Sequence, residues 1–196
     1  MQQQSSVWPF QLDGVENWAY TNNVFSKQEC EEIIRLGNEL TLTSGGIEKS
    51  ELHGDLNIRN SKVAFFNPSP ETHWIFSRLA DHVFNLNSQY FNFELHGMFE
   101  GLQFTKYEAP DGHYVSHIDK CLNTIVRKIS VTVQLSDPSE YVGGELNLFY
   151  GYKPVAGPKE QGTMIAFPSY ALHQVMPVTE GTRYSLVCWV SGPSFR

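Results

Sequence analysis

An imidazole and a carboxylate two residues apart, in His117-Ile118-Asp119, have the types and spacing that could support chemistry. On an extended chain, side chains at positions i and i+2 leave the same face, so His117 and Asp119 can reach one metal ion. A His-x-Asp triplet also arises by chance, in which case the two side chains form a solvated pair in a loop. The triplet alone leaves both interpretations open.

His173 lies 54 residues after Asp119 and is a third candidate ligand. Two histidines and one carboxylate form a facial triad, which leaves three positions of an octahedral Fe(II) ion open. Three positions are enough for a chelating co-substrate and O2, whereas a catalytic zinc site is usually tetrahedral and keeps one position free. We therefore predict that His117, Asp119 and His173 are the metal ligands and the catalytic residues.

Arg183 follows His173 by ten residues and precedes a segment, 184–190, that is rich in strand-forming residues. A planar guanidinium can pair with a carboxylate through two parallel hydrogen bonds, which a lysine point charge does less specifically. An isolated arginine is more often a surface charge. Close to the triad, Arg183 is instead predicted to bind the carboxylate of a co-substrate.

Polar side chains on a predicted strand, 129–135, could line a pocket near these residues. One face of this strand is apolar and should meet the helices, while Thr132 and Gln134 lie on the other face and could contact a polar small molecule. A solvated polar face fits the pattern equally well. Tyr107 and Tyr114 bracket the loop that leads into the triad, and either phenol could donate to a carboxylate, although such tyrosines are more often only packed. We predict these four as cofactor-binding residues.

The elements that must position these side chains divide into a helical half and a strand-rich half. Ser26 and Glu29 form a capping-box pattern that begins an amphipathic helix. Pro70, at an expected first helical position, begins a second helix that runs to about Leu86. A strand is expected between the two helices, at 58–67. From about residue 98, short period-two segments typical of antiparallel strands follow, at 102–107, 129–135, 145–150, 163–167 and 184–190.

Helices followed by strands favour an α+β fold, in which N-terminal helices cover one face of a sheet that folds over as a sandwich or jelly roll. The length corresponds to about one domain, so we expect a single domain over 1–196. Its parts are an N-terminal arm and helical support region (1–97) and a strand-rich core (98–192). The aromatic arm at 1–24 is expected to pack on the domain, and the polar segment 38–56 is a candidate lid.

The composition excludes several functional classes. A formal net charge of −7 lacks the basic character of a protein that grips nucleic acid, so a nucleic-acid partner is not expected. No apolar run approaches the roughly 18 to 20 residues of a membrane span, and the first residues lack a signal-peptide pattern, so we expect a cytoplasmic protein with no membrane partner. Three widely spaced cysteines indicate neither a disulfide framework nor a thiolate zinc site.

Taken in order, the motifs of the second half resemble the Fe(II)- and 2-oxoglutarate-dependent dioxygenases, and within them the prolyl 4-hydroxylase-like branch that includes bacterial hydroxylases of the PKHD type. The resemblance covers about residues 98–192, roughly half of the chain. It rests on an ordered series: Tyr107, Tyr114, His117-x-Asp119, Arg127, Leu135-Ser136-Asp137-Pro138, Gly143-Gly144-Glu145-Leu146, and His173 followed by Arg183.

The resemblance implies a cupin-like double-stranded β-helix with Fe(II) held by the triad and the distal carboxylate of 2-oxoglutarate held by Arg183. O2 is the further co-substrate that it implies, and ascorbate is a candidate reductant. It also implies that Arg127, Trp189 and Tyr114 contact the substrate. This sequence has Gln134 where oxygen-sensing prolyl hydroxylases often have a tyrosine, and Arg183 where many collagen-type enzymes have a lysine.

The leading hypothesis is therefore a dioxygenase that hydroxylates a prolyl residue in a protein or peptide and releases succinate and CO2. One alternative keeps the chemistry and changes the substrate to an amino acid, a lipid or another small molecule, or a nucleobase. A second alternative is a non-enzymatic cupin-like module that binds metal. Asp119 argues against halogenation, because related halogenases lack this carboxylate and hold halide in its place.

Overall fold

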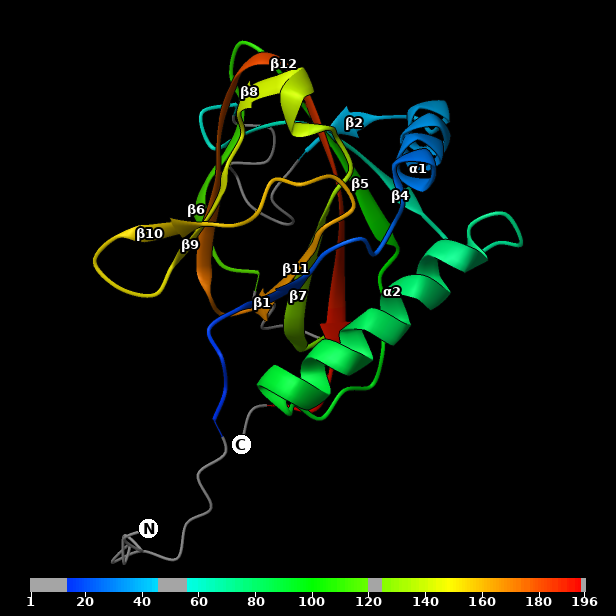
Figure 1. Ribbon diagram of the computed structural model, residues 1–196, viewed down its shortest axis with the longest axis vertical. Helices are drawn as coiled ribbons and strands as arrows, with labels where there is room; N and C mark the ends of the chain where they lie inside the picture. Colours follow the sequence, from blue (N-terminus) through cyan, green and yellow to red (C-terminus); the bar gives the residue numbers. More distant parts are fainter. Residues whose placement is uncertain (1–13, 46–55, 120–124, 195–196) are drawn as a thin grey trace, which may run out of the picture.

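The computed structural model describes residues 14–45, 56–119 and 125–194. Helices pack against antiparallel strands in this part of the chain (Figure 1), which confirms the predicted α+β class. Among the described residues, no helix has both the length and the apolar character that a bilayer span requires.

Most strands form two sheets that share their longest member, β12 (Leu172–Ser191). We call them the major and the minor sheet, and all pairings in both are antiparallel. The order in the major sheet is β1 (Ala19–Thr21), β11 (Met164–Pro168), β7 (Arg127–Gln134), β12, β5 (Leu102–Glu108), β4 (Lys62–Phe66) and β2 (Thr43–Ser44). In the minor sheet, β12 pairs with β6 (Gly112–His117), β8 (Tyr141–Gly143) and β9 (Leu146–Phe149), while β3 (Arg59–Asn60) pairs with β6 and β10 (Pro154–Ala156) pairs with β9. A short 3-10 turn, η2 (Pro138–Glu140), precedes β8.

Strand β12 crosses from one sheet to the other (Figure 1). Its first half, 172–181, pairs with β6, β8 and β9, whereas 182–191 pairs with β5 and β7. Gly181 lies at the crossing with a φ of 72°, and a Cβ there would lie 2.1 Å from the carbonyl oxygen of Glu140. Only glycine fits this backbone, which lets one strand place His173 and Arg183 on two different sheets.

Helix α1 (Lys27–Glu39) begins at the predicted capping box. The Ser26 hydroxyl accepts from the Glu29 amide at 3.3 Å, and the Ser26 amide donates to the Glu29 carboxylate at 2.8 Å. Both contacts satisfy amides that have no partner within the helix, so the local sequence alone defines this start.

Helix α2 (His73–Leu86) begins three residues after Pro70, so the prediction that Pro70 is the first helical residue is wrong. Ser69 and Thr72 exchange hydrogen bonds between the amide of each and the hydroxyl of the other, at 3.1 and 3.2 Å. These bonds stabilise a turn at the position where the helix was expected to start. A π-helical turn, η1 (Asn87–Phe91), continues α2.

The helices pack on one face of the major sheet, and the polar side chains of β7 lie on its other face. The apolar side chains of β7, including Val131 and Val133, join the helices in the larger core, as predicted. A smaller core between the sheets contains Tyr107 and Phe167. Gln134, on the polar face of β7, is 1 % exposed, so this face is not solvated. It contributes to the space between the sheets.

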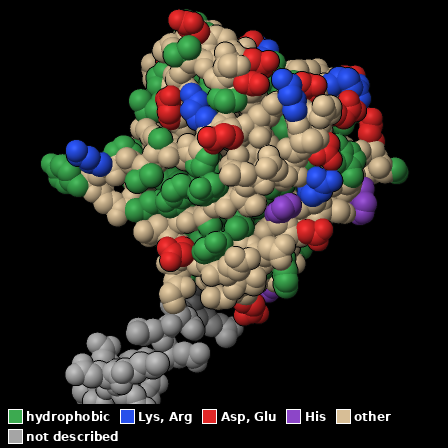
Figure 2. Space-filling model, in the orientation of Figure 1, with side chains coloured by type: hydrophobic (Ala, Val, Ile, Leu, Met, Phe, Trp, Pro, Cys, Tyr) green, Lys and Arg blue, Asp and Glu red, His purple; other side chains and the backbone are tan. Residues whose placement is uncertain are grey.

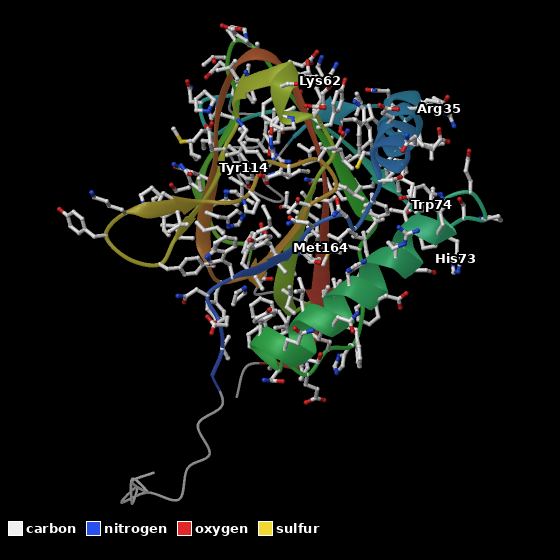
Figure 3. All side chains as sticks on the ribbon, viewed as in Figure 1. Arg35, Lys62, His73, Trp74, Tyr114 and Met164 are labelled. Atoms are coloured by element: carbon white, nitrogen blue, oxygen red, sulfur yellow. The ribbon has the colours of Figure 1, made fainter. Side chains whose placement is uncertain are left out.

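The described part of the aromatic arm includes β1, which pairs with β11 at the edge of the major sheet. Residues 1–13, and residues 46–55 of the candidate lid, lie outside the described chain. On the face shown in Figure 2, hydrophobic side chains gather beside the β9–β10 hairpin, where Tyr152 and Val155 are exposed. Figure 3 contrasts interior Met164 on β11 with Arg35, which points outward from α1.

Candidate metal centre and co-substrate pocket

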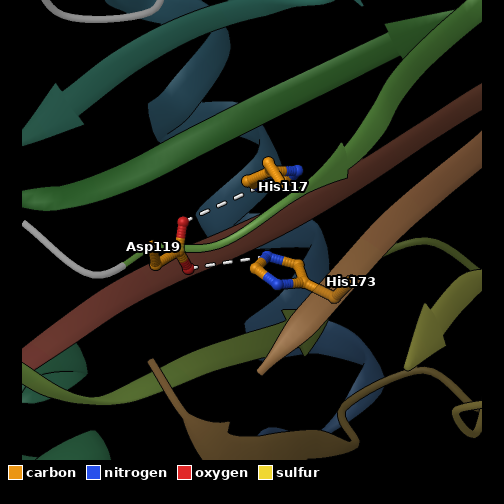
Figure 4. A group of neighbouring side chains, drawn as sticks. All are labelled: His117, Asp119 and His173. Atoms are coloured by element: carbon orange, nitrogen blue, oxygen red, sulfur yellow. Dashed lines mark ion pairs between the residues drawn. The ribbon is translucent and has the colours of Figure 1, made fainter. Parts of the chain in front are cut away.

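The three predicted ligands come together between the two sheets (Figure 4). His117 at the end of β6 and His173 near the start of β12 are directly paired in the minor sheet. Asp119 Oδ1 lies 3.7 Å from His117 Nε2, and Asp119 Oδ2 lies 3.5 Å from His173 Nε2. One ligand atom from each residue lies within 4.8 Å of the other two. The Asp119 side chain is only 11 % exposed, which argues against a solvated loop pair.

Backbone carbonyl groups orient both imidazoles. His117 Nδ1 lies 2.8 Å from the carbonyl oxygen of Val115, and His173 Nδ1 lies 3.0 Å from that of Ala171. A carbonyl can only accept, so each Nδ1 carries the proton and each Nε2 presents a lone pair toward Asp119. This tautomer is the one that a metal ligand requires.

The charge states also fit a divalent cation. Burial, with a smaller contribution from His173, lowers the pKa of His117 to about 4, so its imidazole is neutral near pH 7. Burial alone would raise the pKa of Asp119, but the neighbouring His173 and His117 hold it below its usual value. Two imidazoles and one carboxylate are the donor set that Fe(II) accepts in a facial triad.

Arg183 is 1 % exposed and lies at the start of the second half of β12. Its Nη2 donates to Gln134 Oε1 at 2.8 Å, whereas Nε and Nη1 are buried and find no hydrogen-bond partner in the part of the chain that the structure describes. Within the described residues, Arg183 forms no ion pair with a carboxylate. A buried, unpaired charge is costly, so this arrangement fits the binding of an anion.

The predicted cofactor-binding residues lie in two places. Tyr107 pairs with Arg183 across β5 and β12, and its ring lies 5.4 Å from the guanidinium carbon. Gln134 contacts Arg183 through its carbonyl, but its amide donates to the Pro158 carbonyl at 2.9 Å, so both ends of this side chain are engaged. Tyr114 instead stacks on His117, with ring centroids 3.5 Å apart.

Two further residues shape the wall around Arg183. Thr132, also predicted to bind cofactor, is buried on the same face of β7 as Gln134. Gly144 has a φ of 66°, and a Cβ there would lie 2.9 Å from Arg183 Cδ, so a side chain would press on the arginine.

Arg127 and Trp189, predicted to contact substrate, form one unit beside the metal centre. The guanidinium carbon of Arg127 lies 3.8 Å from the centroid of the Trp189 ring. Arg127 also pairs with Glu100 through Nε and Nη2, and its Nη1 donates to the Asp119 carbonyl at 3.3 Å. The stacked pair therefore adjoins a predicted metal ligand directly.

Several residues of the site were not anticipated from the sequence. Glu100 and Arg59 are two of them. Arg59 is buried; its guanidinium carbon lies 4.6 Å from the centroid of the Tyr114 ring, and its Nε donates to Ser61 Oγ at 2.8 Å. Tyr141 lies beside Arg183; burial raises its pKa and the nearby guanidinium opposes that rise. None belongs to a short motif; strand pairing could have indicated Arg59 and Tyr141, whereas Glu100 lies outside the strands and had no such signal.

Comparison with known sequences points in the same direction. Residues 102–191 match the family model described as the 2OG-Fe(II) oxygenase superfamily. A PKHD-type hydroxylase of Nitrosomonas europaea is 33 % identical over 120 residues, which cover 58 % of this chain and 52 % of that protein. One from Delftia acidovorans is 41 % identical over 96 residues, covering 44 % and 41 %. The chain thus matches about half or less of the length of these curated relatives.

Solved structures share the fold. A Pseudomonas putida prolyl-4-hydroxylase superposes with a TM-score of 0.69 at 17 % identity, covering 91 % of this chain and 94 % of that one. A prolyl hydroxylase from Trichoplax adhaerens, in complex with a hypoxia inducible factor peptide fragment, gives 0.74 at 19 % identity, covering 89 % and 83 %. These similarities confirm the predicted double-stranded β-helix. Residues 102–191 of this chain are thus similar in sequence to the 2OG-Fe(II) oxygenase superfamily, and the chain shares its fold with prolyl hydroxylases of known structure.

Proposed function

We propose that this chain is an Fe(II)- and 2-oxoglutarate-dependent dioxygenase that hydroxylates a prolyl residue in a protein or peptide and releases succinate and CO2. One observation carries the proposal: buried Arg183, with two nitrogen atoms that have no partner among the described residues, contacts Tyr107 of the core between the sheets, and His173 of the triad contacts Phe167 of the same core. A structural arginine would be expected to pair with a carboxylate of its own chain. The unsatisfied donors instead suit the distal carboxylate of 2-oxoglutarate.

The residues of the chain have separate tasks in this proposal. His117, Asp119 and His173 would hold Fe(II), which with 2-oxoglutarate and O2 supplies the oxidising chemistry for hydroxylation of a C–H bond. Arg183 neutralises and orients the co-substrate, and Gln134 holds the guanidinium in place. Tyr107 and Thr132 close the pocket against water.

The prolyl substrate is supported by the surroundings of the metal centre. Trp189, held flat against Arg127, offers an apolar wall of a size that suits a pyrrolidine ring. Arg59 and Arg127 are donors suited to the carbonyl groups of an extended peptide. PKHD-type relatives and prolyl hydroxylases of the same fold favour this substrate class over a free amino acid, a lipid or a nucleobase.

The first experiment tests the co-substrate pair. Fe(II) and 2-oxoglutarate are titrated anaerobically into the protein, and the visible charge-transfer band of chelated 2-oxoglutarate is recorded. We expect the band in the wild type and in Arg35→Ala, a control arginine on the surface of α1 that pairs with Glu32 and Glu39. Arg183→Ala should lose it at matched concentrations. Metal binding without a band in the wild type would contradict the proposal and support a non-enzymatic metal-binding module.

The second experiment tests the substrate. Proline-containing peptides are incubated with Fe(II), 2-oxoglutarate, O2 and ascorbate, and mass spectrometry detects the addition of one oxygen atom. A proline-to-alanine peptide of otherwise identical sequence is the matched control. Turnover of 2-oxoglutarate with no oxygenated peptide, across a broad peptide set, would refute the prolyl assignment and leave the oxygenase chemistry standing.

A further inference from the structure

The turn between β11 and β12 contacts two of the three residues of the triad. The Asp119 amide donates to the Ser169 carbonyl at 3.0 Å, and the Ala171 carbonyl accepts from His173 Nδ1 at 3.0 Å. The turn is itself attached to β7, because the Ser169 amide donates to the Lys128 carbonyl at 2.9 Å. A shift of residues 169–171 would therefore move Asp119 and His173 together.

Two hydroxyl groups extend this contact to the carboxylate. Ser130 Oγ on β7 donates to Asp119 Oδ2 at 2.7 Å, and it lies 3.1 Å from Ser169 Oγ. Ser130 Oγ is the donor in both contacts; because a hydroxyl has one proton, the shorter distance gives it mainly to Asp119, and the Ser169 oxygen helps to keep the Ser130 hydroxyl turned toward the carboxylate. Ser130 is 1 % exposed and Ser169 is 0 % exposed, so water does not compete with this relay.

The carboxylate depends on these hydroxyls more than the imidazoles do. Each imidazole is oriented by a backbone carbonyl two residues earlier in its own strand or turn. A carboxylate can rotate about its terminal bond. Ser130 Oγ holds Asp119 Oδ2 by a short hydrogen bond of 2.7 Å, and Trp189 is a second side chain that interacts with this carboxylate. Losing this bond would leave Asp119 free to turn away from the metal position.

We propose that the Ser169–Ser130 pair is a positioning relay that presents the Asp119 carboxylate to the metal and thereby sets the affinity of the centre. This inference rests on the metal-dependent function proposed above. It adds a part of the centre that the triad motif does not contain, since the two serines lie 39 residues apart in sequence.

The test measures metal affinity directly, by calorimetric titration of Co(II) alone into the metal-free protein. Ser130→Ala should weaken Co(II) binding about 10- to 100-fold, the usual effect of removing a residue that orients a ligand. Ser169→Ala keeps the bond from Ser130 to Asp119 and should cause a smaller loss. The matched control is Ser191→Ala, which removes another buried hydroxyl on the major sheet. This hydroxyl has no hydrogen-bond partner among the described residues, so the variant should bind Co(II) like the wild type.

Two further readings separate positioning from general stability. The metal-free Ser130→Ala protein should melt within a few degrees of Ser191→Ala, while its Co(II) absorption spectrum should differ from that of the wild type. Ser130→Thr restores a hydroxyl and should recover most of the affinity. A Thr variant that binds as weakly as Ser130→Ala would show that the hydroxyl is not the determinant.

The outcomes distinguish the two proposals. Wild-type protein that binds no Co(II), or a His173→Ala variant that binds it normally, would overturn the metal-dependent function itself. Normal binding by the wild type with equal affinity in Ser130→Ala would overturn only the relay. Selective weakening in the order Ser130→Ala, then Ser169→Ala, with Ser191→Ala unchanged, would establish it.

Discussion

Replacement of Arg183 by lysine tests whether a fork of donors, rather than positive charge alone, binds the co-substrate. Arg183→Lys keeps the charge but exchanges a planar group with five donors for a compact ammonium with three. In the structure, Nη2 is engaged by Gln134 at 2.8 Å while Nε and Nη1 remain for a ligand. An ammonium cannot serve Gln134 and a carboxylate in the same fixed geometry.

The size of the effect follows from one lost charged hydrogen bond. Such a bond contributes about 1.5 to 3 kcal/mol, and about 1.4 kcal/mol corresponds to a tenfold change in affinity. We therefore expect the Kd of 2-oxoglutarate to rise roughly 10- to 150-fold in Arg183→Lys. Gln134 adds to the loss of binding energy. Its side chain is only 1 % exposed, so when the hydrogen bond from Arg183 is lost, water cannot reach the Gln134 side-chain carbonyl to replace that bond.

The assay is the anaerobic charge-transfer titration at saturating Fe(II), with 2-oxoglutarate varied. Affinity for the metal alone should not change, since Arg183 is not one of the three ligands, and Arg35→Lys serves as the surface control. Unchanged 2-oxoglutarate affinity in Arg183→Lys, with normal metal binding, would show that the distal carboxylate binds elsewhere and would refute the reasoning.

Three other predictions follow from the same geometry. Gly144→Ala should destabilise the fold by about 1–3 kcal/mol, because a φ of 66° is unfavourable for alanine. It should also weaken 2-oxoglutarate binding, because the new Cβ would meet Arg183. Thermal melts measure the first effect, and the charge-transfer titration measures the second. Glu100→Gln should raise the KM for a peptide substrate roughly tenfold, about 1.4 kcal/mol, without changing 2-oxoglutarate affinity, because it releases Arg127. Acid should destabilise the metal-free protein. His117 has a pKa of about 4 in the folded protein and an ordinary pKa of 6.5 in the unfolded chain, so the unfolded state binds more protons between these pH values. The free energy of unfolding therefore falls as the pH drops through this window, by an amount on the order of 3 kcal/mol. Denaturant unfolding at several pH values measures this loss, and a His117→Gln variant that loses stability just as steeply would contradict the assignment.

Local physical chemistry made part of this protein predictable from sequence. The start of α1 was predicted correctly because a capping box involves residues three positions apart. The start of α2 was not, because mutual hydrogen bonds between Ser69 and Thr72 stabilise a turn that the proline rule does not anticipate. Strand β12 was predicted only over 184–190, whereas its partners on two sheets keep it extended from 172 to 191.

The types and order of the candidate site residues were determined by the sequence itself. His117, Asp119, His173 and Arg183 carry donor atoms whose chemistry depends on the side chain alone, and their order along the chain is enough to propose a metal centre and an anion site. The alternation along β7 likewise predicted which of its faces is polar, because a strand has a period of two.

Only the tertiary structure decided how these residues are held. Burial keeps the His117 imidazole neutral, the neighbouring histidines keep the pKa of Asp119 low, and burial leaves Arg183 with donors that have no partner among the described residues. Glu100 reaches Arg127 from 27 residues away, and Ser169 reaches Ser130 from 39 residues away. Such contacts depend on which strands pair and in which register, and those pairings arise from the packing of the whole chain rather than from any local stretch of it.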